Sequence, residues 1–228
     1  MDPHDSSLSV RIAHHLREQI ITGEIPMGGK LNERQIAEAL EVSRVPVREA
    51  LPILEAEGFI SSQPRRGAVV HLFTIDDARE VFDLRRELEP LAARLAADRA
   101  AAGADTGALR AALAYAREPV TLAPSTRNSD LHEEILLLSR HALLQRMSGL
   151  LNGRVRWLFH LTPERDTDSM WQEHAELVDA IVAGRADLAF LLAEAHVERG
   201  RVESLPLLAD RLPAPPAPAR RRRAAPQS

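Results

Sequence analysis

Two groups of residues in this chain have types and spacings suited to binding chemistry. Arg44 and Arg48 are one helical turn apart, so on a helix both guanidinium groups lie on the same side. Such groups donate hydrogen bonds to guanine edges and to phosphate oxygens. His132, His174 and His196 lie in three separate segments with helical apolar spacing. If these imidazoles converge, they can ligate zinc, nickel or a similar ion, although a lone helical histidine is more often a surface or hydrogen-bonded core residue.

The segment 31–70 contains the elements that must position the two arginines. Asn32 can cap a first helix, and Ser43 can cap a second helix that ends at Gly58. Val47, Leu51 and Leu54 point toward a core, on the side opposite the arginines. After Gly58 a strand, a basic turn and a returning strand follow. This order predicts a winged helix-turn-helix, which places its second helix in the major groove of DNA.

Pro52 departs from this pattern because it lies inside the second helix. Proline lacks an amide donor, so it is expected to kink or loosen the helix. The position is beyond the end that would read DNA. We therefore expect lower stability rather than lost recognition.

Composition limits the class of protein. The 228 residues suffice for two small domains, and the absence of cysteine excludes disulfides and thiolate metal sites. No apolar run is long enough to cross a membrane and the N-terminus lacks a signal-peptide core, so we expect a cytoplasmic protein. The net charge is -4. A nucleic-acid surface must therefore concentrate its positive charge on one face.

The predicted fold class is mostly α, in four parts. An arm over 1–7 precedes a winged helix-turn-helix domain over 8–73, whose first helix over 8–22 should point Val10, Ala13, Leu16 and Ile20 inward. An all-α bundle of about six helices follows over 74–211, with Thr74 as the cap of its first helix. The tail over 212–228 is rich in proline, alanine and arginine and is expected to be disordered. Its arginines are either solvated or in weak nonspecific contact with DNA.

The DNA-binding segment closely resembles the GntR family of bacterial transcription regulators. The resemblance rests on the run from Leu31 to Gly58, which contains VSRVPVREAL, and on Pro64, Arg66 and Gly67 in the wing. It implies a set of DNA-binding residues at positions that match the family pattern: Arg34, Ser43, Arg44, Pro46, Val47, Arg48, Arg66 and Gly67.

The helical body looks like the FCD effector domain of the FadR subgroup of that family. Leu84, Arg85, Leu88 and Glu89 match its opening motif, and His174 and His196 have the family's separation. The resemblance implies a divalent metal site, with zinc or nickel as the ion, built from Asn128, His132, His174 and His196. Asn128 stands where the family has an aspartate, so the site lacks one negative charge and should bind a transition ion less tightly.

In similar domains the metal holds a carboxylate effector beside an arginine, and Arg85 is the matching residue. The alternative for Arg85 is a salt bridge with Glu89 one turn later. Arg154 and Arg156 are further candidates for lining the same cavity.

The resemblance implies a metabolite-responsive regulator, with repression as the favoured sign. A homodimer would bind a palindromic double-stranded operator, and a small organic acid would shift the population between two forms. Two rival classes of protein are compatible with some of these residues. A metalloenzyme would need a general base, and Glu133, Glu134 and Glu173 form no zinc-protease motif. The other alternative is an architectural DNA-binding protein whose helical domain serves only dimerisation.

Overall fold

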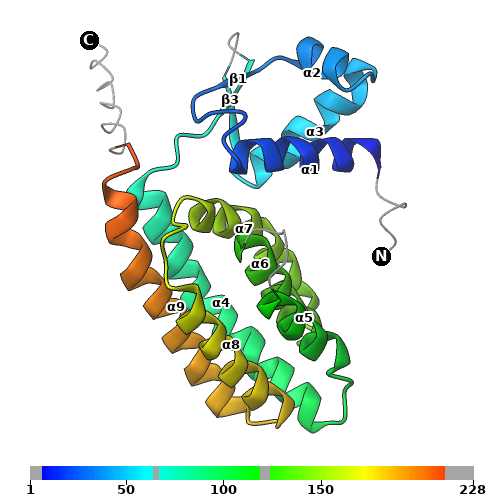
Figure 1. Cartoon of the computed structure of the whole chain (residues 1–228). Coiled ribbons are helices and arrows are strands. Elements are labelled where there is room, and N and C mark those ends of the chain that lie inside the picture. The colour runs from blue at the N-terminus through cyan, green and yellow to red at the C-terminus, as the bar shows by residue number, and fades with distance from the viewer. Residues whose placement is uncertain (1–6, 64–66, 119–123, 214–228) are drawn as a thin grey trace, which may run out of the picture.

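The computed structural model describes residues 7–63, 67–118 and 124–213. Its N-terminal part contains three helices and a small antiparallel sheet, shown in blue and cyan in Figure 1. In chain order the elements of this part are α1 (Leu8–Ile21), β1 (Lys30–Leu31), α2 (Glu33–Ala39), α3 (Arg44–Ala56), β2 (Ile60–Gln63) and β3 (Gly67–Val70).

The rest of the described chain is a helical bundle. Its longest helices, α4 and α9, run side by side, and the other helices pack along them (Figure 1). The helices are α4 (Ile75–Ala101), α5 (Gly107–Arg117), α6 (Pro124–Leu138), α7 (Ala142–His160), α8 (Thr167–Val182) and α9 (Ala186–Ala209). Thr74 and Asp77 form a reciprocal capping box at the start of α4. The predicted class, a winged helix-turn-helix followed by an all-α bundle, is confirmed.

The sheet has the strand order β1-β3-β2, with both pairs antiparallel. Ile60 pairs with Val70 in the hairpin, and Lys30 pairs with Val69 across the other edge of β3. The hairpin was predicted, but β1 was not, because two residues are too few to show a strand period. Because β1 directly precedes α2, its pairing with β3 connects the wing to the start of α2.

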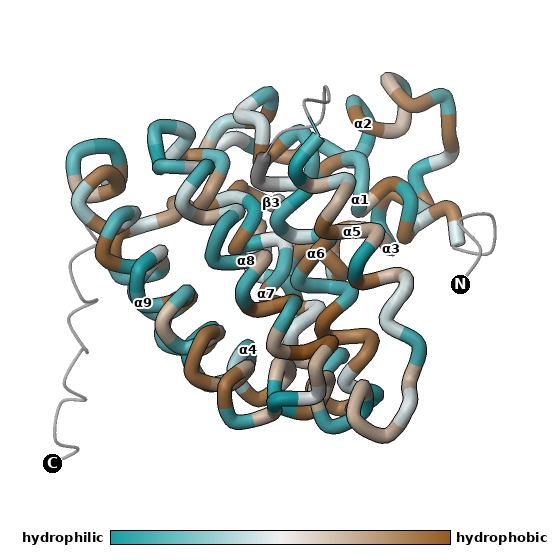
Figure 2. The backbone as a smooth tube through the Cα atoms, turned by 60° about the horizontal axis from the view of Figure 1, so that its bottom comes forward, coloured by the Kyte–Doolittle hydropathy of each residue, from teal (hydrophilic) through white to brown (hydrophobic). Residues whose placement is uncertain are grey.

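Two apolar cores hold the molecule together. One fills the bundle between α4, α5, α6, α8 and α9. The other begins in the N-terminal part and continues into the top of the bundle, where Trp157 of α7 stacks on Phe59 at 5.3 Å between ring centroids. Brown and teal stretches alternate along the helices in Figure 2, as expected for amphipathic helices around these cores.

One local prediction was wrong. Ala13, Leu16 and Ile20 of α1 are buried as expected, but Val10 is 44% exposed and Ile12 is buried. Pro52 lies inside α3, which runs to Ala56, and the expected kink or loosening of this helix stays a prediction. The flanking Leu51 and Leu54 are both buried, and this packing sustains the helix despite the missing amide donor. No helix among the described residues is both long and apolar enough to cross a membrane. The predicted disordered arm and tail lie almost wholly outside the described residues.

Candidate functional site

The first candidate surface is the exposed side of α3. Ser43 is its N-cap residue, although its side chain makes no capping bond, and the first turns carry Arg44 and Arg48. Their side chains are 58% and 63% exposed. Val47 lies between them in sequence but is fully buried, so its side chain faces the core and cannot contact DNA directly. Pro46 is partly buried.

The arginines share an open groove with the start of α2 and the wing. Lys30, Asn32, Arg34 and Gly67 also line this groove, so α2, α3, β1 and β3 all contribute to it. Asn32 caps α2 by accepting hydrogen bonds from the amides of Arg34 and Gln35. Gly67 adopts φ 78°, a left-handed conformation that favours glycine, where β3 begins. The predicted contact at Arg66 lies outside the described residues.

The second candidate site is a histidine cluster in the bundle. His132 of α6, His174 of α8 and His196 of α9 each offer a ring nitrogen, and these nitrogens lie within 4.8 Å of one another. The Nε2 atoms of His132 and His174 are 3.1 Å apart. Three separate helices therefore bring together the imidazoles expected to converge.

Carboxylates bind the outer nitrogens of two of these rings. Glu89 Oε2 is 3.3 Å from His132 Nδ1, and Glu173 Oε2 is 2.8 Å from His196 Nδ1. A carboxylate on Nδ1 fixes the ring and leaves Nε2 available as a ligand, an arrangement common around metal-bound histidines. Glu173 also pairs with Arg199, so it is not placed as a free general base.

Burial keeps His132 and His174 neutral. It lowers the pKa of His132 to about 4, and it lowers that of His174 well below its ordinary value. Burial raises the pKa of Glu89, but the charge and hydrogen bond of Arg85 outweigh this and hold it at about 2. Neutral imidazoles beside an ionised carboxylate form a donor set suited to a divalent cation.

Asn128 supplies an independent sign that the site can take a ligand. It is 3% exposed, and its Oδ1 atom is buried without a hydrogen-bond partner among the described residues. Asn128 and His132 lie one turn apart on α6 and line the same cavity. A buried carbonyl without a donor is costly, and coordination of a cation would satisfy it.

This cavity, which we call the histidine cavity, is lined by His132 but not by His174 or His196. It has a volume of about 40 Å³, enough for a few water molecules. It lies among α4, α6, α7, α8 and α9, and most of its wall is apolar, including Leu88, Ile135 and Val155. Glu89 is the one acidic or basic lining side chain, besides His132, among the described residues.

Arg85 does not line this cavity. It is 1% exposed, and its Nε donates to Glu89 Oε1 at 2.5 Å. The salt bridge considered as the alternative is therefore formed, while one nitrogen, Nη1, has no partner among the described residues. Contact between Arg85 and an effector stays a prediction.

Arg154 and Arg156 were expected as candidates for the cavity wall, but they face the N-terminal part. Arg154 Nη2 donates to the carbonyl of Gly58 at 2.9 Å. Arg156 forms two bonds of 2.6 Å with Glu18 on α1. The prediction for these arginines was wrong because sequence spacing cannot show which neighbour a helix side meets.

α7 thus has two functions in packing. Ser148, Leu151 and Asn152 line the histidine cavity. Gly153 and Trp157 pack against Phe59 of the N-terminal part. The same helix therefore borders the cavity and packs on Phe59, which follows α3 in the chain.

Three acidic residues near these sites were missed as binding residues: Glu33, Glu89 and Glu173. Glu33 accepts hydrogen bonds from Arg44 and Arg48. Glu89 was expected as a motif residue and as a partner for Arg85, not as a partner for His132. Each carboxylate–histidine pair joins two different helices, so no short sequence motif predicts the pair.

Two family comparisons agree with the two halves of the chain. Residues 8–70 match the family described as bacterial regulatory proteins, gntR family, and residues 80–199 match the FCD domain. The HTH-type transcriptional regulator YdhC of Bacillus subtilis is 36% identical over 87 residues, which is 38% of this chain and 39% of that protein. The gluconate operon transcriptional repressor of the same organism is 45% identical over 84 residues, 37% of this chain and 34% of that protein. The chain thus spans about two fifths or less of the length of these two relatives.

Longer matches cover both halves. A protein of Paenarthrobacter nicotinovorans named as a D-xylose utilization operon transcriptional repressor is 28% identical over 182 residues, 78% of this chain and 80% of that protein. A crystal structure of a GntR transcriptional regulator from Rhodococcus sp. RHA1 is 27% identical, with a TM-score of 0.73, and covers 88% of this chain and 99% of that chain. The structure of McbR/YncC from E. coli shares the fold, with a TM-score of 0.71 at 22% identity, covering 86% of this chain and 96% of that chain.

Proposed function

This chain belongs to the GntR family of bacterial regulatory proteins and carries an FCD domain, and from that premise we propose that it is a metabolite-responsive transcriptional repressor. The observation that carries the proposal is the exposed pair Arg44 and Arg48 on α3, in a groove shared with the wing. The family and the matched relatives are regulators rather than enzymes, which argues against a metalloenzyme. Two of those relatives are named as operon repressors, which favours repression.

The proposed DNA complex is a homodimer on a palindromic operator, because two-fold symmetry presents two copies of α3 to two half-sites. Arg44 and Arg48 would read base edges. Arg34, Ser43 and Gly67 border the same face and would contact the backbone. Arg66 is assigned to the same proposed contact only because it matches the wing pattern of the GntR family.

We propose that the bundle holds a divalent ion, zinc or nickel, through His132, His174 and His196, with the Asn128 carbonyl as a fourth donor. The clustered ring nitrogens, the carboxylates behind two rings and the unpartnered Asn128 oxygen support this assignment. The bound ion would supply positive charge in a cavity that otherwise contains the negative charge of Glu89.

The effector we propose is a compact organic acid whose binding depends on the metal. No lysine or arginine lines the cavity in the described part of the chain, so a carboxylate has no other cation to meet there. The mostly apolar wall fits an acid with a short apolar body better than one with many hydroxyl groups, each of which would need a hydrogen-bond partner.

Because the cavity has room for only a few waters, a larger ligand must displace the helices around it. α7 is one of these helices, and it also supports the N-terminal part through Trp157 and Arg156. An effector that prefers the displaced arrangement would shift the population away from the form that binds DNA.

A thermal-shift experiment tests the sensing half of the proposal. Protein stripped with EDTA is melted alone, with Zn²⁺ or Ni²⁺, with an organic acid, and with both. We expect metal to raise the melting temperature and the acid to raise it further only when metal is present. The variant His174→Ala should lose both effects. The matched control His160→Ala removes an exposed histidine of α7 and should keep them.

The architectural alternative predicts a different result. If neither metal nor any acid changes the melting temperature or the affinity for DNA, the helical domain serves only assembly. Selection of duplexes from a random DNA library, followed by fluorescence anisotropy, tests the DNA half independently. A protein that enriches no sequence would contradict the regulator assignment.

A further inference from the structure

One carboxylate contacts both arginines of the candidate reading face. Glu33 is the first residue of α2, and its Oε2 accepts from Arg44 Nη2 at 3.3 Å and from Arg48 Nη2 at 3.0 Å. Arg48 Nε donates to the same oxygen at 3.2 Å. The Glu33 side chain is 27% exposed, so it is more enclosed than either arginine.

The geometry leaves the arginines able to bind DNA. Glu33 occupies the Nε/Nη2 edge of Arg48, and the Nη1/Nη2 edge stays available. A guanidinium group has five N–H donors, and two parallel donors suffice for the O6 and N7 atoms of guanine. Glu33 therefore need not be displaced when Arg48 reads a base.

Fixing a guanidinium in advance favours selective binding. A free arginine side chain loses rotamer freedom when it is immobilised in a complex, and pre-organisation reduces that loss. A nearby carboxylate also repels phosphate, which weakens binding to any sequence. The first effect raises the ratio of specific to nonspecific affinity, and the second lowers the affinity for unselected DNA. The hydrogen bond from Arg48 lowers the pKa of Glu33, so the carboxylate is charged at neutral pH.

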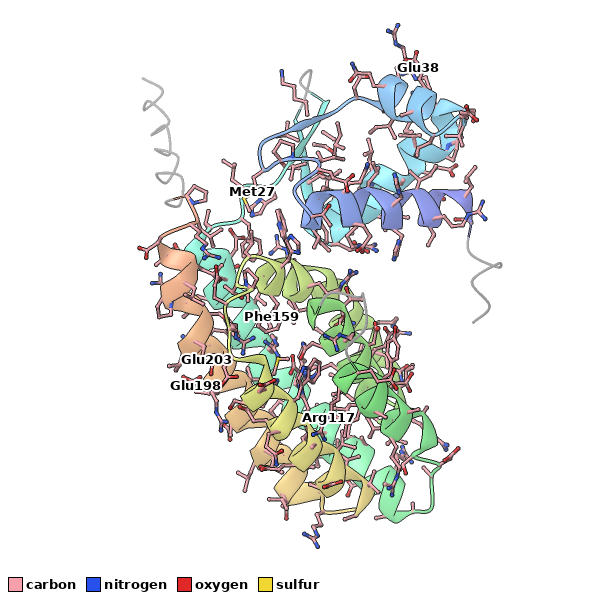
Figure 3. The ribbon with its side chains drawn as sticks, viewed as in Figure 1. Met27, Glu38, Arg117, Phe159, Glu198 and Glu203 are labelled. Carbon is pink, nitrogen blue, oxygen red and sulfur yellow. The ribbon has the colours of Figure 1, made fainter. Side chains whose placement is uncertain are left out.

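We infer that Glu33 is a positioning residue for sequence readout, which holds Arg44 and Arg48 together and suppresses binding to unselected DNA. The inference rests on the proposed DNA-binding function and adds to it the residue that sets selectivity. Glu38, at the other end of α2, lies on the side away from the bundle and pairs with Arg34 at 3.4 Å (Figure 3). Glu33 thus pairs with Arg44 and Arg48, whereas Glu38 pairs with Arg34.

The test compares Glu33→Ala and Glu33→Gln with the full-length wild type. Duplexes are first selected from a random library by the wild type. The affinity of each variant is then measured by anisotropy on the selected duplex and on a scrambled duplex, over a series of salt concentrations. The matched control is Glu49→Gln, which removes the same charge from an exposed position of α3. Among the described residues the ion pairs of Arg44 and Arg48 go to Glu33 and not to Glu49. Circular dichroism confirms that each variant is folded.

For Glu33→Ala we expect tighter binding to scrambled DNA and a roughly tenfold fall in the ratio of selected to scrambled affinity, equivalent to about 1.4 kcal/mol. Glu33→Gln keeps an oxygen acceptor without the charge and should recover part of the ratio. Glu49→Gln should leave the ratio unchanged. A second selection with Glu33→Ala should return relaxed preferences at the bases that the two arginines read.

Different failures have different meanings. If Glu33→Ala strengthens both affinities in parallel, the carboxylate only repels phosphate, and the positioning role is overturned. If it weakens both in parallel, Glu33 only stabilises the N-terminus of α2, with the same consequence. A wild type that selects no sequence would instead overturn the proposed function, and the role of Glu33 with it.

Discussion

Replacing Gly153 by alanine should weaken the contact between α7 and the N-terminal part. A Cβ atom at this position would lie 2.7 Å from Phe59 Cε2 and 2.9 Å from Phe59 Cζ. Real Cβ atoms essentially never approach so closely, so either the ring or the helix must move. Phe59 is fully buried and stacked on Trp157, which leaves the ring little freedom to turn aside.

The magnitude follows from two opposing effects. Alanine in place of glycine in a helix gains about 1 kcal/mol in propensity. Overpacking of a filled core costs about 1–3 kcal/mol. We therefore expect Gly153→Ala to lower the free energy of unfolding by up to about 2 kcal/mol. Gly149, one turn earlier on α7, has no atom within 4 Å of its ideal Cβ position. Gly149→Ala should thus keep the propensity gain of about 1 kcal/mol.

Urea denaturation of the two variants at equal protein concentration gives the comparison. The expected difference in unfolding free energy is about 1–3 kcal/mol in favour of Gly149→Ala. If Gly153→Ala is as stable as Gly149→Ala, α7 does not pack on Phe59 as described, and the reasoning that links the cavity to α3 fails.

Three further outcomes are expected. Arg44→Ala and Arg48→Ala should each weaken binding to a selected duplex by about 1–3 kcal/mol, measured by anisotropy, and an unchanged affinity would contradict their assignment to base readout. His174→Ala should abolish bound metal in elemental analysis of the purified protein, whereas equal metal content in the variant and the wild type would count against the site. Metal-free protein should lose stability as the pH falls from about 6.5 to about 4, because the unfolded chain takes up protons that buried His132 excludes. Chemical denaturation at several pH values measures this slope, and a flat profile over that range would contradict the burial of a neutral imidazole.

Local patterns predicted the parts of the fold that local interactions determine. The cap at Asn32, the stop at Gly58 and the one-turn spacing of Arg44 and Arg48 each depend on neighbours in sequence, and all are observed. The convergence of the histidines was predicted mainly by resemblance. Spacing alone does not place three separate helices side by side.

The parts that were missed depend on contacts between distant segments. Glu33 meets Arg44 and Arg48 only because α2 and α3 cross in the folded domain. Arg154 and Arg156 face α1 and Gly58 rather than the cavity, a choice set by how the bundle meets the N-terminal part. Helical periodicity gives the sides of a helix but does not identify the partner of each side.

The shared position of α7 has a thermodynamic consequence. Because the same helix borders the histidine cavity and packs on Phe59, any ligand that changes the DNA affinity through it is subject to reciprocity. Operator DNA must then alter the affinity for that ligand by the same factor. The coupling is therefore measurable from either direction, and a ligand titration with and without DNA reports it without any assay of transcription.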